Sequence, residues 1–221
     1  MEYGLILDMD GVLVNSNPFH KIAWKNFLLG KGYPYSDELF DTVISGKTGD
    51  TSLPIIFGKE VPEKVMSGYL EEIDLEFRKI FGATEETIHF PGLYEFLDAI
   101  KSSGIRTALA TSAPSENVTQ ALEKLRLQDY FHVIINKNDV TRGKPDPEVY
   151  LTTVKRLGIN KGKCVVVEDS KAGIQSALGA GLRVIGFSSS HTREELLDEG
   201  VDMVIDDFTN LNVNEILKIA L

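Results

Sequence analysis

The sequence predicts an α/β fold in which a doubly wound parallel sheet forms the core and a helical domain is inserted after the first strand. From about Ile105 onward, short apolar runs alternate with helical patterns, which is typical of a parallel sheet covered by helices on both faces. Nearly a hundred residues separate Ile105 from the first apolar run, which ends at Leu7. A crossover connection needs only about 10 to 12 residues, so this segment contains an insert.

The expected strands are short runs rich in β-branched and other apolar residues. They are residues 5–7, 105–111, 132–136, 164–169, 183–187 and 203–206. Helices are expected between them. Asp146, Pro147 and Glu148 supply an N-cap, an N1 proline and a first-turn acid for one of these helices. The glycines that should end three of them are Gly104, Gly158 and Gly181.

The insert is predicted to be helical. Asn17-Pro18 should begin its first helix and Ser36 its second, and a long helix should run from Pro62-Glu63 to Phe81. We therefore expect a core domain made of residues 1–14 and 88–221, and a helical cap domain made of residues 15–87.

The composition is that of an ordinary globular protein, with 43% hydrophobic and 25% charged residues among 221. A formal net charge of −10 offers no broad basic surface, so neither nucleic acid nor a membrane is expected as a partner. The absence of a secretory signal pattern and of an apolar run of about 18 residues predicts a cytoplasmic protein. The single cysteine, Cys164, is expected to be a buried hydrophobe, and a monomer is favoured.

Chemically reactive side chains gather where the expected strands end. The set is Asp8 and Asp10, Thr111 and Ser112, Lys144, and Glu168 and Asp169. Each alone has an ordinary explanation, such as a helix cap for the Thr-Ser pair or a solvated position for the lysine. In an open parallel sheet, however, ligands bind in the crevice outside the carboxyl ends of the strands. Their joint placement therefore predicts a functional site at this edge.

Four carboxylates in one crevice would repel one another unless a cation neutralised them. Mg²⁺ is the predicted cofactor because it prefers oxygen ligands and leaves room for water and a phosphate oxygen. Lys144 would add positive charge, and the groups near Thr111 and Ser112 would suit phosphate oxygens. The residues thus indicate phosphoryl transfer, in which one carboxylate attacks and a second acid moves protons.

Four segments, "DMDGVLVNS", "LATS", "GKPDPE" and "VVVEDSKAGIQSALGAG", resemble the four motifs of the haloacid dehalogenase-like phosphohydrolases, in the same order. The chain is most similar to the branch with a helical cap after the first motif, which holds β-phosphoglucomutase and many small-metabolite phosphatases. "NPFHKIAW" and "ISGKTGDTSL" resemble the first cap helix and the cap specificity loop of that branch. The resemblance implies a Rossmann-like core.

The resemblance also implies a role for each residue of the core motifs. Asp8 would be the nucleophile that forms an aspartyl-phosphate, and Asp10 the general acid and base. Thr111, with the amide of Ser112, would hold the phosphoryl group, while Lys144 would bridge that group and the nucleophile. The implied Mg²⁺ ligands are Asp8, the main-chain carbonyl of Asp10, Asp169 and, through water, Glu168.

Two cap residues are candidates for contact with the substrate. His20 stands where this branch often has a hinge or substrate-facing histidine, with a packed, hydrogen-bonded position beside Trp24 as an equal alternative. Lys47 is the only base in the cap loop, and a solvated surface position is its ordinary explanation. Asn15 replaces the Asp that many relatives have at the start of the cap, which changes the charge of the linker.

We expect a Mg²⁺-dependent phosphatase that hydrolyses a small phosphorylated metabolite through an aspartyl-phosphate. The alternative is β-phosphoglucomutase, but the mutases usually have an arginine in the cap loop for a distal phosphate. Here the loop offers Lys47, and the helix containing "YLEEIDLEF" is acidic. A non-catalytic protein that binds a metal or a phosphorylated ligand is a further alternative, disfavoured because Asp8 and Asp10 are both present. A dehalogenase is disfavoured because that chemistry needs neither a metal nor an acid at Asp10.

Overall fold

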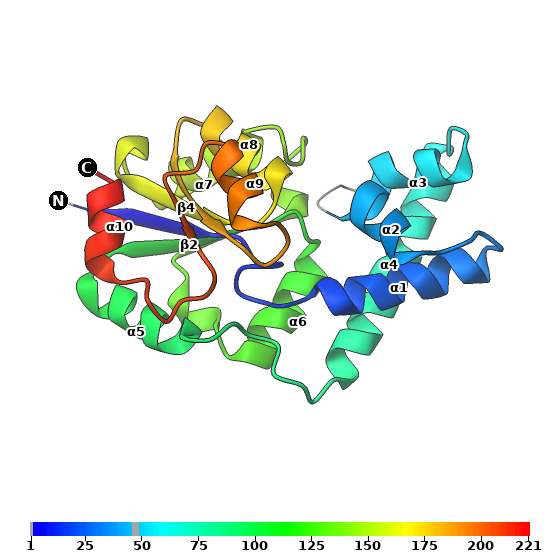
Figure 1. Ribbon diagram of the computed structural model, residues 1–221, viewed down its shortest axis with the longest axis horizontal. Coiled ribbons are helices and arrows are strands. Elements are labelled where there is room, and N and C mark those ends of the chain that lie inside the picture. Colours follow the sequence, from blue (N-terminus) through cyan, green and yellow to red (C-terminus); the bar gives the residue numbers. More distant parts are fainter. Residues whose placement is uncertain (1, 46–48) are drawn as a thin grey trace. The chain divides into compact units, whose positions relative to one another are not determined.

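The computed structural model describes residues 2–45 and 49–221, which form two compact units (Figure 1). The core unit contains the chain up to Asn15 together with Ile88–Leu221, and the cap unit contains Ser16–Thr87. Each unit has its own cluster of buried apolar side chains. No helix in the described ranges is long and apolar enough to cross a membrane.

A parallel sheet of six strands, in the order β3-β2-β1-β4-β5-β6, forms the centre of the core unit. The strands are β1 (Gly4–Leu7), β2 (Arg106–Ala110), β3 (Val133–Ile135), β4 (Cys164–Glu168), β5 (Arg183–Phe187) and β6 (Met203–Ile205). Every residue of β1 and β4 is buried, and apart from Glu168 at the end of β4 both strands are continuous apolar runs without alternation. The predicted α/β, doubly wound, Rossmann-like core is confirmed.

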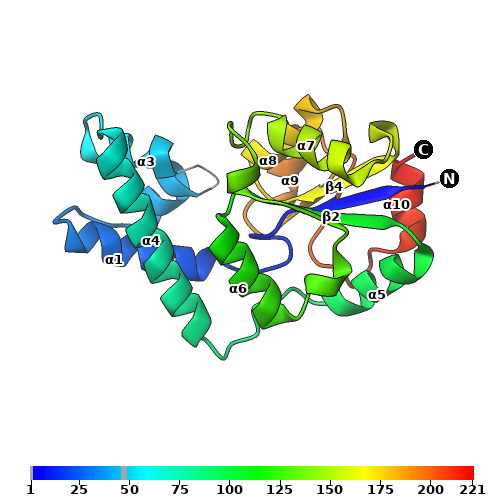
Figure 2. The same ribbon diagram turned by 180° about the vertical axis from the view of Figure 1, so that it is seen from behind.

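Helices cover both faces of this sheet. They are α5 (Leu93–Ser103), α6 (Ser115–Leu125), α7 (Glu148–Leu157), α8 (Lys171–Gly179), α9 (Arg193–Asp198) and α10 (Val213–Ile219). Figures 1 and 2 show α5 and α6 on one side of the sheet and α7 and α8 on the other. Gly104 and Gly158 end α5 and α7 in the left-handed conformation, with φ of 77° and 73°, as the sequence predicted.

The register of the sheet decides which side chains meet at its carboxyl edge. Leu7 of β1 pairs with Leu109 of β2 on one side and with Val167 of β4 on the other. The next residues along the three strands are Asp8, Ala110 and Glu168. Because neighbouring strands run in the same direction, these three positions are adjacent at the edge.

The cap unit is helical, as predicted. It contains α1 (Asn17–Gly30), α2 (Asp37–Leu39), the π-helix η1 (Phe40–Ile44), α3 (Gly49–Phe57) and α4 (Glu63–Ala83). Long helices α1 and α4 pack against each other, and α4 begins next to Pro62 as expected. The helix expected at Ser36 is only a short turn that continues directly into η1; the Ser36 hydroxyl accepts a hydrogen bond from the amide of Leu39.

The segment expected as a cap specificity loop is partly helical, because α3 begins at Gly49. A Cβ at Gly49 would lie 2.3 Å from Cδ2 of Leu70 in α4, so a larger residue there would have to displace the end of the Leu70 side chain. The start of α3 therefore packs against α4, a contact that the local sequence pattern could not indicate.

Candidate active site

Lys144 lies at the centre of a buried group of charges at the carboxyl edge of the sheet. Its Nζ donates hydrogen bonds to Asp8 Oδ1 at 2.7 Å and to Glu168 Oε1 at 2.6 Å. A third bond, at 3.2 Å, goes to the carbonyl oxygen of Ala110 at the end of β2. The lysine side chain is 7% exposed, so both ion pairs are shielded from solvent. The structure thus joins three neighbouring strand ends through one ammonium group.

The loop that carries Lys144 is held by the first turn of α7. The Glu148 carboxylate accepts hydrogen bonds from the amides of Thr141 and Arg142, at 2.9 and 3.0 Å. The amide of Glu148 in turn donates to Asp146 Oδ1 at 3.0 Å. The hydrogen bonds from Thr141, and then those from Arg142, lower the pKa of Glu148 to about 2, so its carboxylate remains ionised over the ordinary pH range.

Glu168 is fully buried, and protein donors engage both of its oxygens. Oε1 accepts from Lys144 and, at 2.8 Å, from the Tyr150 hydroxyl. Oε2 accepts from the Asp169 amide and from the amide and hydroxyl of Ser170, at 3.0 to 3.1 Å. A Cβ at Gly173 would lie only 1.8 Å from Oε1, so α8 can approach this close only with glycine there. Glu168 is therefore the counter-charge of Lys144, a pairing that the sequence did not predict.

Asp169 lies beside this pair and is 5% exposed. Its Oδ2 accepts hydrogen bonds from the hydroxyls of Ser190 and, at 3.2 Å, Ser189. Burial, and then the charge of Glu168, raise the pKa of Asp169 to about 7. The protein alone therefore does not neutralise this carboxylate.

The pKa of Asp8 is also raised by its surroundings. Burial raises the pKa of Asp8 well above its ordinary value, and the charges of Glu168, Asp169 and Asp10 add to this effect, while Lys144 opposes it. Asp10 lies in the turn that follows β1, where Gly11 has φ of 78° and its amide donates to the carbonyl of Val14 at 2.7 Å. The chain turns directly after β1, so Asp8 and Asp10 lie in this turn and not in a longer strand.

Three of these carboxylates could share one cation. One oxygen each from Asp8, Glu168 and Asp169 lie within 4.8 Å of one another, and all three residues are buried. A single lysine faces three acids, so the group has an excess of negative charge in a dry environment, which is the condition that a hard divalent cation relieves. The donor set, all oxygen, fits Mg²⁺.

Thr111 and Ser112 follow β2 at the same edge. Thr111 is 1% exposed; its amide donates to the carbonyl of Ile135 at 3.0 Å and its hydroxyl accepts from the amide of Ala113 at 3.1 Å. The chain therefore turns directly after Thr111. The two residues lie one strand away from Asp8.

The cap candidates belong to the other unit. His20 in α1 stacks on Phe77 in α4, with ring centroids 4.1 Å apart and planes 11° apart. Trp24 is 7% exposed and belongs to the apolar interior of the cap, as expected of a core residue. Lys47 lies outside the described residues.

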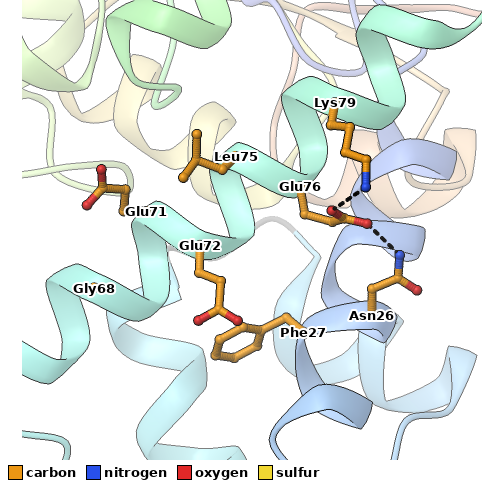
Figure 3. A pocket seen from close by; sticks show the side chains of 8 residues that line it. All are labelled: Asn26, Phe27, Gly68, Glu71, Glu72, Leu75, Glu76 and Lys79. Atoms are coloured by element: carbon orange, nitrogen blue, oxygen red, sulfur yellow. Dashed lines mark hydrogen bonds and ion pairs between the residues drawn. The ribbon is translucent and has the colours of Figure 1, made fainter.

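The cap unit also contains a groove between α1 and α4, with a volume of about 690 Å³ (Figure 3). Its lining residues are Asn26, Phe27, Gly68, Glu71, Glu72, Leu75, Glu76 and Lys79. Glu76 accepts from Asn26 at 2.7 Å and pairs with Lys79 at 3.7 Å (Figure 3). Three glutamates of α4, Glu71, Glu72 and Glu76, line this groove, in agreement with the predicted acidic character of the helix.

Tyr150, Ser189 and Ser190 contact the site but were not expected there from the sequence. Tyr150 is a fully buried residue of α7, and in a helical pattern such a residue is indistinguishable from ordinary core. The two serines belong to the run "FSSSH", which follows an expected strand. Because ligands bind at the carboxyl ends of parallel strands, this polar run could have been predicted to reach the site.

Comparisons with known proteins agree with the geometry. Residues 5–187 match the family described as haloacid dehalogenase-like hydrolase. A phosphorylated carbohydrates phosphatase from Thermotoga maritima is 33% identical over 95% of this chain and 96% of its own length. Beta-phosphoglucomutase from Bacillus subtilis is 26% identical over 95% of this chain and 91% of its own. A solved HAD hydrolase of family IA, variant 3, from Entamoeba histolytica is 29% identical, with a TM-score of 0.91 over 100% of this chain and 99% of that chain.

These matches cover the cap as well as the core, and they include a named phosphatase that aligns over nearly its whole length. The predicted likeness to the β-phosphoglucomutase and phosphatase branch, and the prediction of an enzyme of this kind, are confirmed. The chain belongs to the haloacid dehalogenase-like hydrolase family.

Proposed function

We propose that this protein is a Mg²⁺-dependent phosphatase that removes the phosphate group from a small phosphorylated carbohydrate. The observation that carries the proposal is the contact of the buried Lys144 ammonium with Asp8 Oδ1 at 2.7 Å, beside two further buried acids. This arrangement suits a carboxylate nucleophile whose phosphorylated form keeps a cationic partner. The name of the Thermotoga maritima relative supports a phosphorylated carbohydrate as the substrate.

In the first step, the Asp8 carboxylate attacks phosphorus, an oxygen–phosphorus bond forms, and the bond from phosphorus to the sugar oxygen breaks. Asp10 donates a proton to the departing sugar oxygen. In the second step, water attacks the phosphorus of the aspartyl-phosphate and gives a proton to Asp10. The bond between phosphorus and the Asp8 oxygen breaks, and inorganic phosphate leaves with Asp8 restored.

Other residues at the edge hold the phosphoryl group during these steps. Lys144 donates to its oxygens while Glu168 keeps the ammonium in place through the 2.6 Å contact. Thr111 and the amide of Ser112, one strand away, supply neutral donors. Glu168 thus acts on the phosphoryl group through the lysine.

Asp8, Asp169 and the main-chain carbonyl of Asp10 would hold Mg²⁺. When bound, this ion neutralises the carboxylates and the negative charge of the phosphoryl oxygens. Glu168 already accepts five hydrogen bonds from the protein, so we assign it to the ion only through an intervening water. The excess of buried acids over lysine in this cluster supports the assignment.

Water, and not a sugar hydroxyl, is the proposed acceptor. A mutase must hold the second phosphate of a bisphosphate, which calls for cations in the cap. In the described part of the cap, three of the six lysines are paired with acids of the same unit: Lys21 with Asp41, Lys31 with Glu72 and Lys79 with Glu76, at 2.9, 2.7 and 3.7 Å. Hydrolysis places no such demand on the cap.

The nucleophile is tested by release of inorganic phosphate from a panel of sugar phosphates with Mg²⁺. Asp8→Asn should abolish turnover because an amide cannot form the aspartyl-phosphate. Asp198→Asn, at the exposed end of α9, is the matched control and should retain wild-type activity. Residual activity of Asp8→Asn above about a hundredth of wild type would contradict the role assigned to Asp8.

The acceptor is tested by ³¹P NMR with β-glucose 1-phosphate, Mg²⁺ and a trace of the 1,6-bisphosphate. We expect free phosphate to appear at a steady rate if this ester is used at all, with glucose as the other product. Accumulation of glucose 6-phosphate while free phosphate stays at background would show that the enzyme is a mutase.

A further inference from the structure

We propose that Ser190, supported by Ser189, is a positioning residue that orients Asp169 for a divalent cation. The loop after β5 holds Asp169 Oδ2 against the protein and leaves Oδ1 for the metal. This inference rests on the Mg²⁺-dependent function proposed above. It gives a role to Ser189 and Ser190, which take part in no step of the proposed reaction.

The sheet brings this loop to the site. Strands β4 and β5 are neighbours and parallel, with Glu168 opposite Gly186. The residues just beyond the two strands therefore lie at the same edge, Asp169 after β4 and the serines after β5. Neither serine is near Asp169 in the sequence.

The two hydroxyls have different main partners. Ser189 Oγ lies 2.5 Å from the carbonyl oxygen of Gly11 and 3.2 Å from Asp169 Oδ2. A hydroxyl has one proton to donate, and the shorter contact identifies Gly11 as its main acceptor. Ser190, whose hydroxyl also contacts Oδ2, is then the principal donor to Asp169.

Packing fixes the same oxygen from the other side. A Cβ built on Gly11 would lie 1.9 Å from Asp169 Oδ2 but 3.0 Å from Oδ1. Oδ2 therefore rests against the backbone of the turn that carries Asp8 and Asp10, in space that only glycine leaves open. Ser189 binds the carbonyl of that same glycine, so the loop and the turn hold the carboxylate together.

A carboxylate with one oxygen held in this way cannot rotate freely and presents the other oxygen in a fixed direction. Partners of this kind orient metal-binding side chains, and losing one typically costs about 10- to 100-fold in metal affinity or activity. Ser190 also donates a charge-assisted hydrogen bond to the carboxylate of Asp169, which favours the ionised form that binds a cation. Both effects favour cation binding.

The test is calorimetric titration of MgCl₂ into the metal-free protein, with no substrate present. Ser190→Ala should weaken Mg²⁺ binding by about tenfold or more. Ser190→Thr keeps the hydroxyl and should restore binding to within about threefold of wild type. Ser188→Ala is the matched control: its hydroxyl bonds Asp206 Oδ1 at 2.5 Å and should leave Mg²⁺ affinity unchanged.

The outcomes separate this inference from the function on which it rests. If the wild type binds Mg²⁺ and Ser190→Ala binds it equally well, the role of Ser190 is wrong and the phosphatase proposal stands. If the wild type does not bind Mg²⁺, the metal dependence fails, and this inference fails with it. Circular dichroism checks folding; should Ser190→Ala not fold, Ser190→Cys, which is a weak donor of similar size, replaces it in the same titration.

Discussion

Replacing Asp169 with Asn should stabilise the metal-free protein at neutral and alkaline pH, although it removes a proposed metal ligand. Asp169 is buried next to Glu168, and these two influences raise its pKa from 3.8 to about 7. Keeping this carboxylate ionised in the folded state therefore costs free energy. Asparagine has nearly the same shape and can still accept the hydrogen bond from Ser190, but it does not ionise.

The sign and size of the change in stability follow from the raised pKa of Asp169. A folded-state pKa above the unfolded value means that the folded chain binds the proton more tightly. The stabilisation is then complete below about pH 4 and is lost as the pH rises through about 7. A shift of about three pKa units corresponds to about 4 kcal/mol at most. The free energy of unfolding of Asp169→Asn, minus that of the wild type, should therefore grow from about pH 4 to about pH 7 and then remain constant.

Urea unfolding in the presence of EDTA, between about pH 4.5 and about pH 8, gives this difference directly. Asp198→Asn, an exposed carboxylate on α9, should follow the wild-type curve and serves as the control. Excess Mg²⁺, at about a hundred times its dissociation constant, should stabilise the wild type by about 3 kcal/mol and Asp169→Asn by much less. A difference that does not change with pH, or that is larger in acid, would refute the electrostatic account.

Two further predictions concern the surroundings of Glu168. Tyr150→Phe keeps the buried ring but removes the 2.8 Å hydrogen bond to Glu168, so urea unfolding should show a loss of about 2 kcal/mol; an unchanged midpoint would show that this bond is not needed. Gly173→Ala places a methyl group 1.8 Å from Oε1 of Glu168, whose carboxylate is held by five hydrogen bonds, and should cost about 3 kcal/mol or abolish folding. Gly179→Ala, in the same helix with 3.7 Å to its nearest neighbour, is the control and should be tolerated in thermal unfolding.

The core of the fold could be predicted because its strands are buried on both faces and leave uninterrupted apolar runs. Parallel pairing then brings their ends together, so Asp8, Glu168 and Asp169 could be expected at one edge although long stretches of sequence separate them. The pairing within the cluster could not be predicted. Whether Glu168 faces a metal or Lys144 depends on side-chain directions, and these are decided by contacts such as the Tyr150 hydroxyl and the space at Gly173.

The cap was less predictable for a different physical reason. Its helices were indicated by caps and prolines, but α2 is only three residues long and η1 is a π-helix. Short elements of this kind have weak local signals and depend on tertiary packing. The start of α3 at Gly49 is such a case, because this residue packs against the Leu70 side chain of another helix.

The buried charges explain why one edge of the sheet can support both binding and chemistry. Lys144 compensates Glu168 through a 2.6 Å contact, and its second contact reaches only one oxygen of Asp8. Asp169 is left without a full counter-charge, so in the metal-free protein it holds a proton up to about pH 7. Below about pH 7, a cation that binds there must displace this proton, which couples metal binding to pH. The same excess of negative charge that costs stability in the metal-free protein therefore favours the binding of a divalent ion beside the nucleophile.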